Sequence, residues 1–286
     1  MTILPISDNV PYSSPPSPTG SVSSTARRHA RFSRHPSSTF ASYTSLRLPL
    51  VLRRLFKPPT LDFETAIWEI CYLFIAPKKV YRQIYYHQVL KNRPETKNTW
   101  ARDDPSFALL LSGFLMLSAV AWGIAYSPGF FPIIRLMFNI VLVDFLLVGS
   151  IIATAGWFLA GRFLRQRTSR GVMSMSQQDS KLEWAYCFDV HCNSFLMIWF
   201  CLYVLQFVML PLIIRDNWFS LLLGNSLYLG AFSYYVVISY LGYSALPFLE
   251  HTEMILLPIL AFVLLFLASL FGFNISRHAV KFYFGS

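Results

Sequence analysis

The sequence predicts an all-α polytopic membrane protein with five transmembrane helices, preceded by amphipathic interfacial helices and a disordered N-terminal tail. Hydrophobic residues make up 55% of the 286 residues and charged residues only 13%, whereas about 25% of the residues of a soluble domain are charged. The segment from Phe107 to Tyr126 contains twenty residues without a charge or a proline. A helix of that length spans about 30 Å, the hydrocarbon thickness of a bilayer, and satisfies its own backbone hydrogen bonds there.

Residues 1–47 are rich in Ser, Thr and Pro and contain few large apolar side chains. They bury too little apolar surface to offset the entropy of ordering, so we expect a disordered cytosolic tail. Arginines among serines, with Asp8 as the only acid before Asp62, are also typical of a mitochondrial transit peptide. The sequence favours the basic tail and leaves the transit peptide as the alternative.

Residues 48–105 are predicted to form a basic cytosolic segment with two amphipathic helices. The first can be capped by Thr60 and has apolar side chains on one face, at Phe63, Ile67, Ile70, Cys71 and Phe74. It is too short to cross a bilayer before Pro77 ends it, so it should lie in the interface or pack on the bundle. The second runs from Lys78 to about Leu90. Its mixture of basic and aromatic residues also suits nucleic acid, but so close to a membrane span no nucleic acid partner is expected.

Adjacent carboxylates precede the first span, at Asp103 and Asp104. Either can cap that helix, with Pro105 at its first position. Adjacent carboxylates can also bind a metal or act as acid and base, but no companion ligand lies at a usable spacing.

The membrane domain covers residues 106–272, with spans predicted at 107–126, 136–160, 195–214, 221–242 and 254–271. A cytosolic loop, 161–194, joins the second span to the third, and 273–286 form a short lumenal tail. Gly224 and Gly230 in the fourth span are expected to permit close helix contact.

The orientation follows from the distribution of positive charge. Fifteen lysines and arginines precede the first span and four arginines follow the second, which predicts that both flanking segments are cytosolic. These residues should attract the anionic cytosolic leaflet. The predicted membrane-surface residues are Arg53, Arg54, Lys78, Lys79, Arg82, Arg162, Arg165, Arg167 and Arg170. The C-terminus is then lumenal, where Asn274 begins a formal glycosylation sequon close to the membrane.

Asp144 lies inside the second predicted span. An intramembrane carboxylate is by default a functional candidate, for instance in an ion or proton pathway. A transporter or channel for a small solute or ion that uses Asp144 is therefore one hypothesis, although no inverted repeat is evident. A neutral residue that bridges two helices is the competing interpretation.

No metal site, cofactor or catalytic set is predicted. Cys187, Asp189, His191 and Cys192 lie close together in the sequence, but their spacing is not that of a structural zinc site. The four cysteines lie in or beside apolar segments and are expected to be reduced. No set of nucleophile, base and oxyanion donor is present, so we do not expect an enzyme.

Several motifs resemble one known family. They are Leu52-Arg-Arg-Leu-Phe56, Leu61-Asp-Phe-Glu64, Trp100-Ala-Arg-Asp-Asp-Pro105, Glu183-Trp184 with Phe188-Asp-Val-His191, and Leu241-Gly-Tyr-Ser-Ala-Leu-Pro-Phe-Leu249. In this order and spacing, from about residue 50 to 285, the chain resembles the uncoordinated-50 family of eukaryotic Golgi membrane proteins. Cys187 and Cys192 are not part of the family pattern.

The resemblance implies a five-span protein of the Golgi membrane with a cytosolic N-terminus, acting in vesicle-mediated protein transport. It implies recruitment of a large Arf guanine-nucleotide exchange factor and delivery of receptor cargo to the cell surface. It carries no catalytic residues.

These implications lead to a membrane-embedded adaptor as the first functional hypothesis. The expected partner-binding residues form a shared cytosolic surface made by Trp100, Arg102, Asp103, Asp104, Trp184, Asp189 and His191. The alternative role for the same residues is to cap helices and hold loops. Charge reversal at Arg102 and Asp104 distinguishes the two roles, because a structural role predicts loss of the protein itself.

Overall fold

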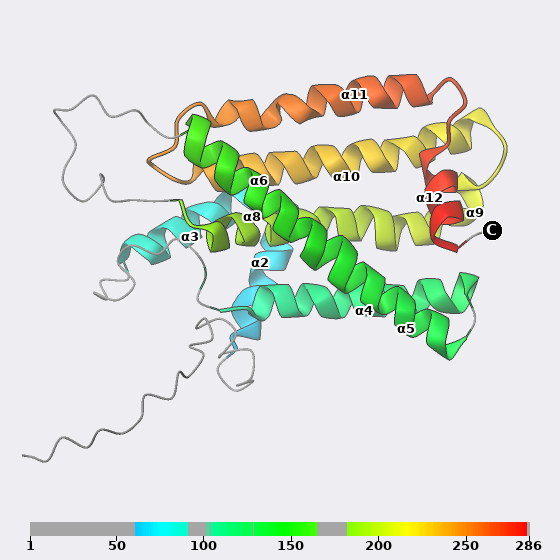
Figure 1. Cartoon of the computed structure of the whole chain (residues 1–286), viewed down its shortest axis with the longest axis horizontal. Coiled ribbons are helices and arrows are strands. Elements are labelled where there is room, and N and C mark those ends of the chain that lie inside the picture. Colours follow the sequence, from blue (N-terminus) through cyan, green and yellow to red (C-terminus); the bar gives the residue numbers. More distant parts are fainter. Residues whose placement is uncertain (1–60, 91–101, 103, 128, 165–181, 285–286) are drawn as a thin grey trace, which may run out of the picture. The chain divides into compact units, whose positions relative to one another are not determined.

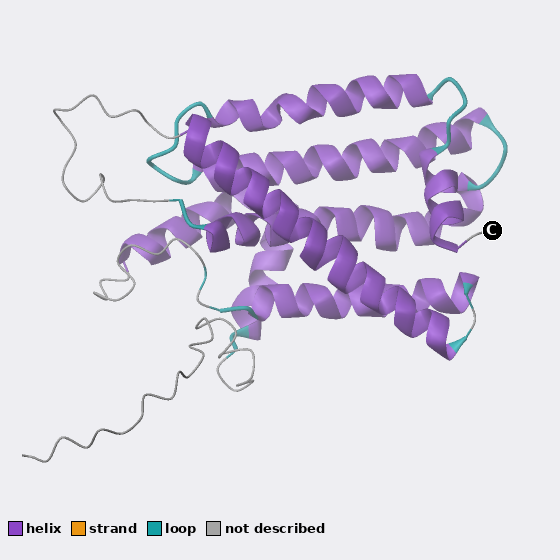
Figure 2. Ribbon diagram, viewed as in Figure 1, coloured by secondary structure: helices purple, strands orange, loops and turns teal. Residues whose placement is uncertain are grey.

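The computed structural model describes residues 61–90, 102, 104–127, 129–164 and 182–284, with the backbone alone for 84–90. Figure 1 shows the elements in chain order, and Figure 2 shows that the regular structure of these residues is helical. The predicted tail, 1–47, lies outside the described residues.

Within the described residues, five helices are long and apolar enough to cross a membrane, which confirms the predicted fold class. They run over Ser106–Tyr126, Phe130–Leu164, Trp184–Ile213, Trp218–Ser244 and Thr252–Ser269. The first is α4 and the fourth is α10. The second consists of α5 (Phe130–Phe138), η2 (Asn139–Leu147), α6 (Val148–Leu159) and η3 (Ala160–Leu164). The third consists of α8 (Trp184–Ile198), η4 (Trp199–Leu205) and α9 (Gln206–Ile213). The fifth consists of η5 (Thr252–Leu256) and α11 (Leu257–Ser269).

The second and third spanning helices are longer than the sequence predicted. The second begins at Phe130 rather than at residue 136, and the third begins at Trp184 rather than at residue 195. Polar residues near the start of α8 do not end the helix, because Asp189, His191 and Asn193 bond to neighbouring elements. The loop predicted at 161–194 therefore narrows to 165–183, most of which lies outside the described residues.

Alternate spans run in opposite directions, so the described loops gather at two ends. The N-terminal end of the bundle carries the short helices, the start of α8 and the turn after α10; there the amide of Glu250 donates to Leu164 O at 2.7 Å. The C-terminal end carries residue 127, the turn before α10 and the turn after α11. α10 lies beside both α8 and α11 (Figure 1).

Two short helices precede the first span, α2 (Phe63–Ile75) and α3 (Pro77–Leu90). Asp62, rather than Thr60, caps α2 with a carboxylate oxygen that accepts from the Thr65 amide at 3.0 Å. The face of α2 that packs on the bundle contains Ala66, Ile70 and Leu73. The apolar face predicted from the sequence is divided, because Phe63 and Ile67 are exposed.

The C-terminal segment, predicted as a tail, forms a further helix, α12 (Ile275–Phe284). The Asn274 side chain begins it by accepting from the Arg277 amide at 3.0 Å. The far end of α12 reaches back to the first span, where the Phe284 ring stacks on Trp122 with centroids 5.7 Å apart. The segment is therefore packed against the bundle.

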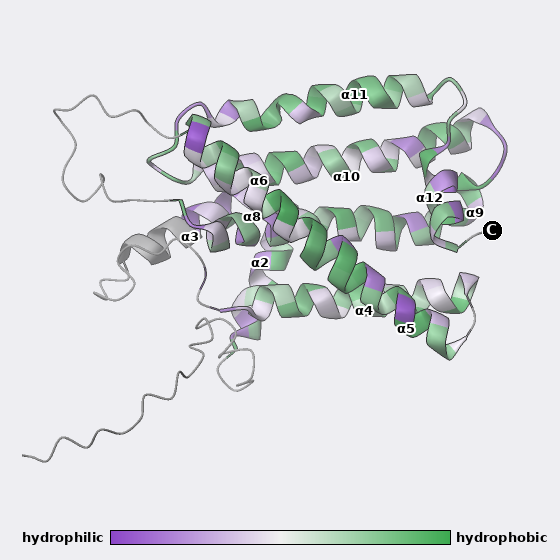
Figure 3. Cartoon of the chain, in the orientation of Figure 1, coloured by the Kyte–Doolittle hydropathy of each residue, from purple (hydrophilic) through white to green (hydrophobic). Residues whose placement is uncertain are grey.

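Hydrophobic residues predominate along the spans (Figure 3), and many of the large apolar side chains are exposed. On α11, for example, Leu257, Leu260 and Leu264 are all more than half exposed. A continuous exposed apolar surface of this kind is stable in lipid and would aggregate in water.

Candidate functional site

A polar cluster at the N-terminal end joins segments that are far apart in the sequence. Its centre is Arg102, whose backbone amide donates to Asp189 Oδ2 at 2.7 Å. Its guanidinium pairs with Glu69 Oε2 of α2 at 3.1 Å and donates to Asn193 Oδ1 of α8 at 2.9 Å. The side chain also lies over the Phe107 ring, 4.9 Å from its centroid. One arginine thus connects α2, α4 and α8.

The Arg102 side chain is only 14% exposed and that of Glu69 only 11%. Burial alone would lower the pKa of Arg102, but the Glu69 and Asp189 carboxylates outweigh it and raise that pKa above its usual value. Burial also raises the pKa of Tyr81, whose hydroxyl accepts from Asn193 Nδ2 at 3.3 Å and stays neutral. Because the buried arginine is charged and paired, removing one member of the pair would leave an uncompensated buried charge.

Asp104 joins the starts of two helices. Its Oδ2 accepts from the backbone amide of Asp62, the N-cap of α2, at 2.8 Å, and its Oδ1 accepts from the Ser106 amide at the start of α4 at 3.1 Å. The structure begins α4 at Ser106 with Pro105 as its N-cap, one residue later than predicted, so Asp104 precedes the cap. Asp104 therefore holds α2 against the first span.

The structure places the remaining predicted partner residues in different environments. His191 is 2% exposed, so it does not belong to the predicted surface; its ring nitrogens lie 2.8 Å from Tyr235 Oη and 3.2 Å from Phe145 O. Trp184 is 42% exposed, and its indole N–H donates to Thr154 Oγ1 at 3.0 Å. Trp100 and Asp103 lie outside the described residues. Partner binding by this set stays a prediction.

Basic residues are exposed at the same end. Lys78, Lys79 and Arg82 of α3 and Arg162 of η3 are exposed. Lys79 Nζ lies 4.3 Å from the centroid of the Tyr72 ring and donates to its hydroxyl at 3.3 Å, which orders the ammonium on α2. The other predicted surface arginines, Arg53, Arg54, Arg165, Arg167 and Arg170, lie outside the described residues.

All four cysteines are free. In the described part of the chain, no group of three His, Cys, Asp or Glu side chains is arranged to hold a metal ion.

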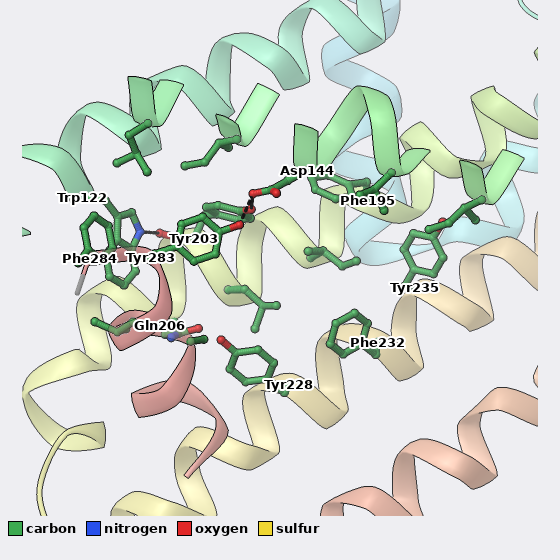
Figure 4. Close-up of a pocket in the computed structure, with 18 of the residues that line it drawn as sticks. Trp122, Asp144, Phe195, Tyr203, Gln206, Tyr228, Phe232, Tyr235, Tyr283 and Phe284 are labelled. Carbon is green, nitrogen blue, oxygen red and sulfur yellow. Dashed lines mark hydrogen bonds between the residues drawn. The ribbon is translucent and has the colours of Figure 1, made fainter. Parts of the chain in front are cut away.

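Asp144 lies on η2, within the second span. Its side chain faces the third span and α12. Tyr203 of η4 donates to its Oδ2 at 3.0 Å, and Tyr283 of α12 donates to the same oxygen (Figure 4). Asp144 therefore bridges helices, and the neutral state that the second interpretation of the sequence gave it stays a prediction. Asp144 also lines a cavity, so the ion-pathway hypothesis is not tested by these contacts. Sequence reasoning missed Tyr203 and Tyr283, because no local pattern links three segments so far apart.

A family model described as the UNC-50 family matches residues 51–284. The chain belongs to the UNC-50 family. The match begins before α2 and ends with α12, so it includes the Arg102 cluster and Asp144 and confirms the resemblance seen in the sequence.

Individual UNC-50 relatives match over most of their length. Protein GMH1 of Saccharomyces cerevisiae is 44% identical over 82% of this chain and 86% of its own. The unc-50 homolog of Dictyostelium discoideum is 38% identical over 92% of this chain and 98% of its own length. The unc-50 homolog of Homo sapiens is 41% identical over 81% of this chain and 85% of its own length. No solved structure gives a significant match.

Proposed function

We propose that this UNC-50 family protein is a non-enzymatic adaptor of the Golgi membrane. It acts in vesicle-mediated protein transport by recruiting a large Arf guanine-nucleotide exchange factor and thereby supports delivery of receptors to the cell surface. The N-terminal end of the bundle is cytosolic and the C-terminal end is lumenal. Family membership is the first support for this proposal.

The observation that carries the proposal is an exposed surface on two helices that do not cross the membrane. On α2 it presents Phe63, Ile67 and Ile75, which are 41%, 52% and 80% exposed, and on α3 it presents Lys78 and Lys79. Exposed apolar side chains beside basic ones are typical of a surface that binds a partner or the anionic leaflet. We call these five residues the α2–α3 surface.

The Arg102 cluster holds this surface in a fixed position on the membrane domain. α2 is attached through the Glu69–Arg102 ion pair and through the Asp62–Asp104 hydrogen bond. A preorganised surface binds more tightly than a mobile one, because less conformational entropy is lost on binding. In this proposal, Arg102 and Asp104 support the partner site without touching the partner.

Proximity labelling from an N-terminal tag tests the proposal. The variant pairs Lys78→Glu with Lys79→Glu, and the matched control is Arg215→Glu, an exposed arginine at the C-terminal end. Both proteins should reach the Golgi, while labelling of the Arf exchange factor is lost only in the lysine variant. Equal labelling in both variants contradicts the proposed surface, and labelling of mitochondrial inner-membrane proteins contradicts the proposed compartment.

The loop after the second span is tested by a separate deletion. The deletion should cover 166–180 alone, because residues from Trp184 onward belong to the third spanning helix. Loss of exchange-factor labelling without loss of Golgi location would assign part of the partner site to this loop. Unchanged labelling would restrict the site to the α2–α3 surface.

A further inference from the structure

A cavity of about 340 Å³ lies among the membrane-spanning helices. Its walls come mainly from the second, third and fourth spans, with Trp122 of the first span and α12 on one side (Figure 4). The volume falls within the range of about 300–1,000 Å³ that is usual for small-molecule sites. The proposed adaptor function does not use this cavity.

Most of the polar side chains of the cavity lie at its α12 end. Asp144, Tyr203, Gln206, Tyr228 and Tyr283 line this part. Figure 4 shows Asp144 at the hydroxyls of Tyr203 and Tyr283, and the Gln206 amide facing the Tyr228 hydroxyl. The rest of the lining is aliphatic or aromatic, apart from the His191 imidazole and the Tyr235 hydroxyl, which lie 2.8 Å from each other. The cavity is thus polar at its α12 end and mainly apolar along the rest of its length.

Asp144 is a carboxylate without a basic partner in the described part of the chain. Both tyrosines donate to Oδ2, and among those residues none donates to Oδ1 and no lysine, arginine or histidine forms an ion pair with it. A carboxylate inside the bilayer is costly unless it is paired. Oδ1 is therefore available to a cation that a ligand brings.

The aromatic rings around Asp144 favour the same kind of ligand. Tyr203, Tyr283 and Tyr228 lie at this end, beside the stacked pair of Trp122 and Phe284. Aromatic faces attract ammonium groups, and the attraction is stronger where water is excluded. A carboxylate among aromatic rings is a typical arrangement for binding an ammonium ion.

The two polar residues that meet here lie on unusual backbone. Asp144 belongs to the π-helical segment η2 and Tyr203 to the π-helical segment η4. Such segments are rare and occur frequently at functional sites. Both neighbouring spans thus depart from the α-helix where their polar side chains meet at the cavity.

A second, mainly apolar cavity adjoins the first on the side of the N-terminal end. This cavity, of about 430 Å³, shares Ile152, His191 and Tyr235 with the first. Its further lining is mainly apolar and includes Leu159, Val236 and Met254. The two cavities together suit a long aliphatic chain better than a compact solute.

We propose that the cavity at Asp144 binds a single-chain amphiphile with a primary ammonium headgroup. The ammonium pairs with Asp144 Oδ1 among the aromatic rings, and the chain extends past Phe195 and Phe232 toward Ile152. α12 covers the headgroup through Tyr283 and Phe284.

Photocrosslinking of the full-length protein in nanodiscs tests this proposal. The probe is an eighteen-carbon primary amine that carries a diazirine and an alkyne in its chain, and the comparison probe is the alcohol of the same chain. The amine should label the wild type saturably, at peptides of the third and fourth spans. Asp144→Asn, which keeps an acceptor for both tyrosines, should reduce amine labelling at least about tenfold, as expected for the loss of a buried charge pair.

A matched pair of variants tests the chain site independently of Asp144. Ile152 lines both cavities, whereas Ile151, its neighbour, is 60% exposed on the outside of the helix and lines neither. Ile152→Trp should reduce amine labelling severalfold, and Ile151→Trp should leave it unchanged. Equal labelling by amine and alcohol that is unaffected by Asp144→Asn overturns the proposal, as does crosslinking confined to lipid-facing peptides. Normal thermal unfolding of each variant is required for either conclusion.

Discussion

Arg102 shows how a single residue can appear to be a surface contact in the sequence and be interior in the fold. It follows the long basic segment and precedes two acids, which is a typical exposed pattern. In the structure its guanidinium is paired with Glu69 and Asn193, and its backbone amide with Asp189. We therefore propose that the partner binds the α2–α3 surface, and that Arg102 holds this surface in place.

Replacing Arg102 should destabilise the whole protein. Arg102→Ala removes the guanidinium that pairs with the buried Glu69 carboxylate, and breaking a buried ion pair costs about 3–5 kcal/mol. The matched control is Arg82→Ala on exposed α3, where a change within about 0.5 kcal/mol is expected. The free energy of unfolding in detergent micelles measures both. Equal stability of the two variants would mean that the cluster contributes little.

The glycines of the spans are not equivalent, although the sequence does not distinguish them. A methyl group on Gly149 would collide with the His191 ring, whereas one on Gly230 meets nothing within 4 Å. The predicted close contact at Gly230 is therefore absent. The predicted close contact at Gly224 is present, because side-chain atoms of Ile213 and Ser276 would lie 2.9 Å from a Cβ added there.

This difference predicts opposite signs for two alanine substitutions. Gly149→Ala overfills the contact between α6 and α8 and should cost about 1–3 kcal/mol. Gly230→Ala should be neutral or stabilise by up to about 1 kcal/mol, because alanine favours the helix over glycine. Thermal unfolding of the two variants and the wild type measures the sign of each change in stability. A Gly149→Ala protein as stable as the wild type would show that α6 and α8 are loosely packed.

At the scale of elements, α12 is the feature that sequence periodicity did not find. The segment is short, basic and follows the last span, so it was expected to be a lumenal tail. It packs instead through a buried asparagine of α10, because Asn225 donates to Ser269 Oγ at 2.8 Å and to Phe273 O at 2.9 Å. Asn225 Oδ1 also accepts from the Ile275 amide at 2.9 Å. The exposed ion pair of Arg277 with Asp216 adds little to this attachment.

Asn225→Ala should release α12 from the bundle. The loss leaves buried partners unsatisfied, with an expected cost of about 1–3 kcal/mol. Ser226→Ala, at the exposed next position, is the control. Limited trypsin digestion reports the release, because Arg277 and Lys281 on α12 become cleavable. Resistance of both variants to trypsin would show that other contacts suffice to hold the helix.

At the scale of the whole molecule, the proposed orientation makes the C-terminal end lumenal. Asn274 should still escape glycosylation, because its amide donates to Ile213 O at 3.1 Å and Ser276 of the same sequon is fully buried. A sequon on a flexible tail added after Ser286 should be glycosylated, and the same tail before Met1 should not. Mobility on a gel before and after glycosidase treatment measures both. Modification of the N-terminal tail alone would reverse the orientation.

The sequence by itself determined the number of spans and the membrane environment. Apolar composition and segment length are properties of consecutive residues, and the thickness of the bilayer converts them directly into spanning helices. It also determined the family, because the motifs from residue 52 to residue 249 occur in a recognisable order. The starts of α2 and α4 were predicted only to within one or two residues, because several adjacent residues can serve as a cap.

Only the tertiary structure decided which polar residues face one another. Glu69, Arg102 and Asp189 belong to three elements, as do Asp144, Tyr203 and Tyr283. The extension of the third span to Trp184 has the same cause, because its polar residues find partners on other helices. A hydrogen bond between distant segments depends on how the helices cross, and the order of residues along one chain does not contain that angle.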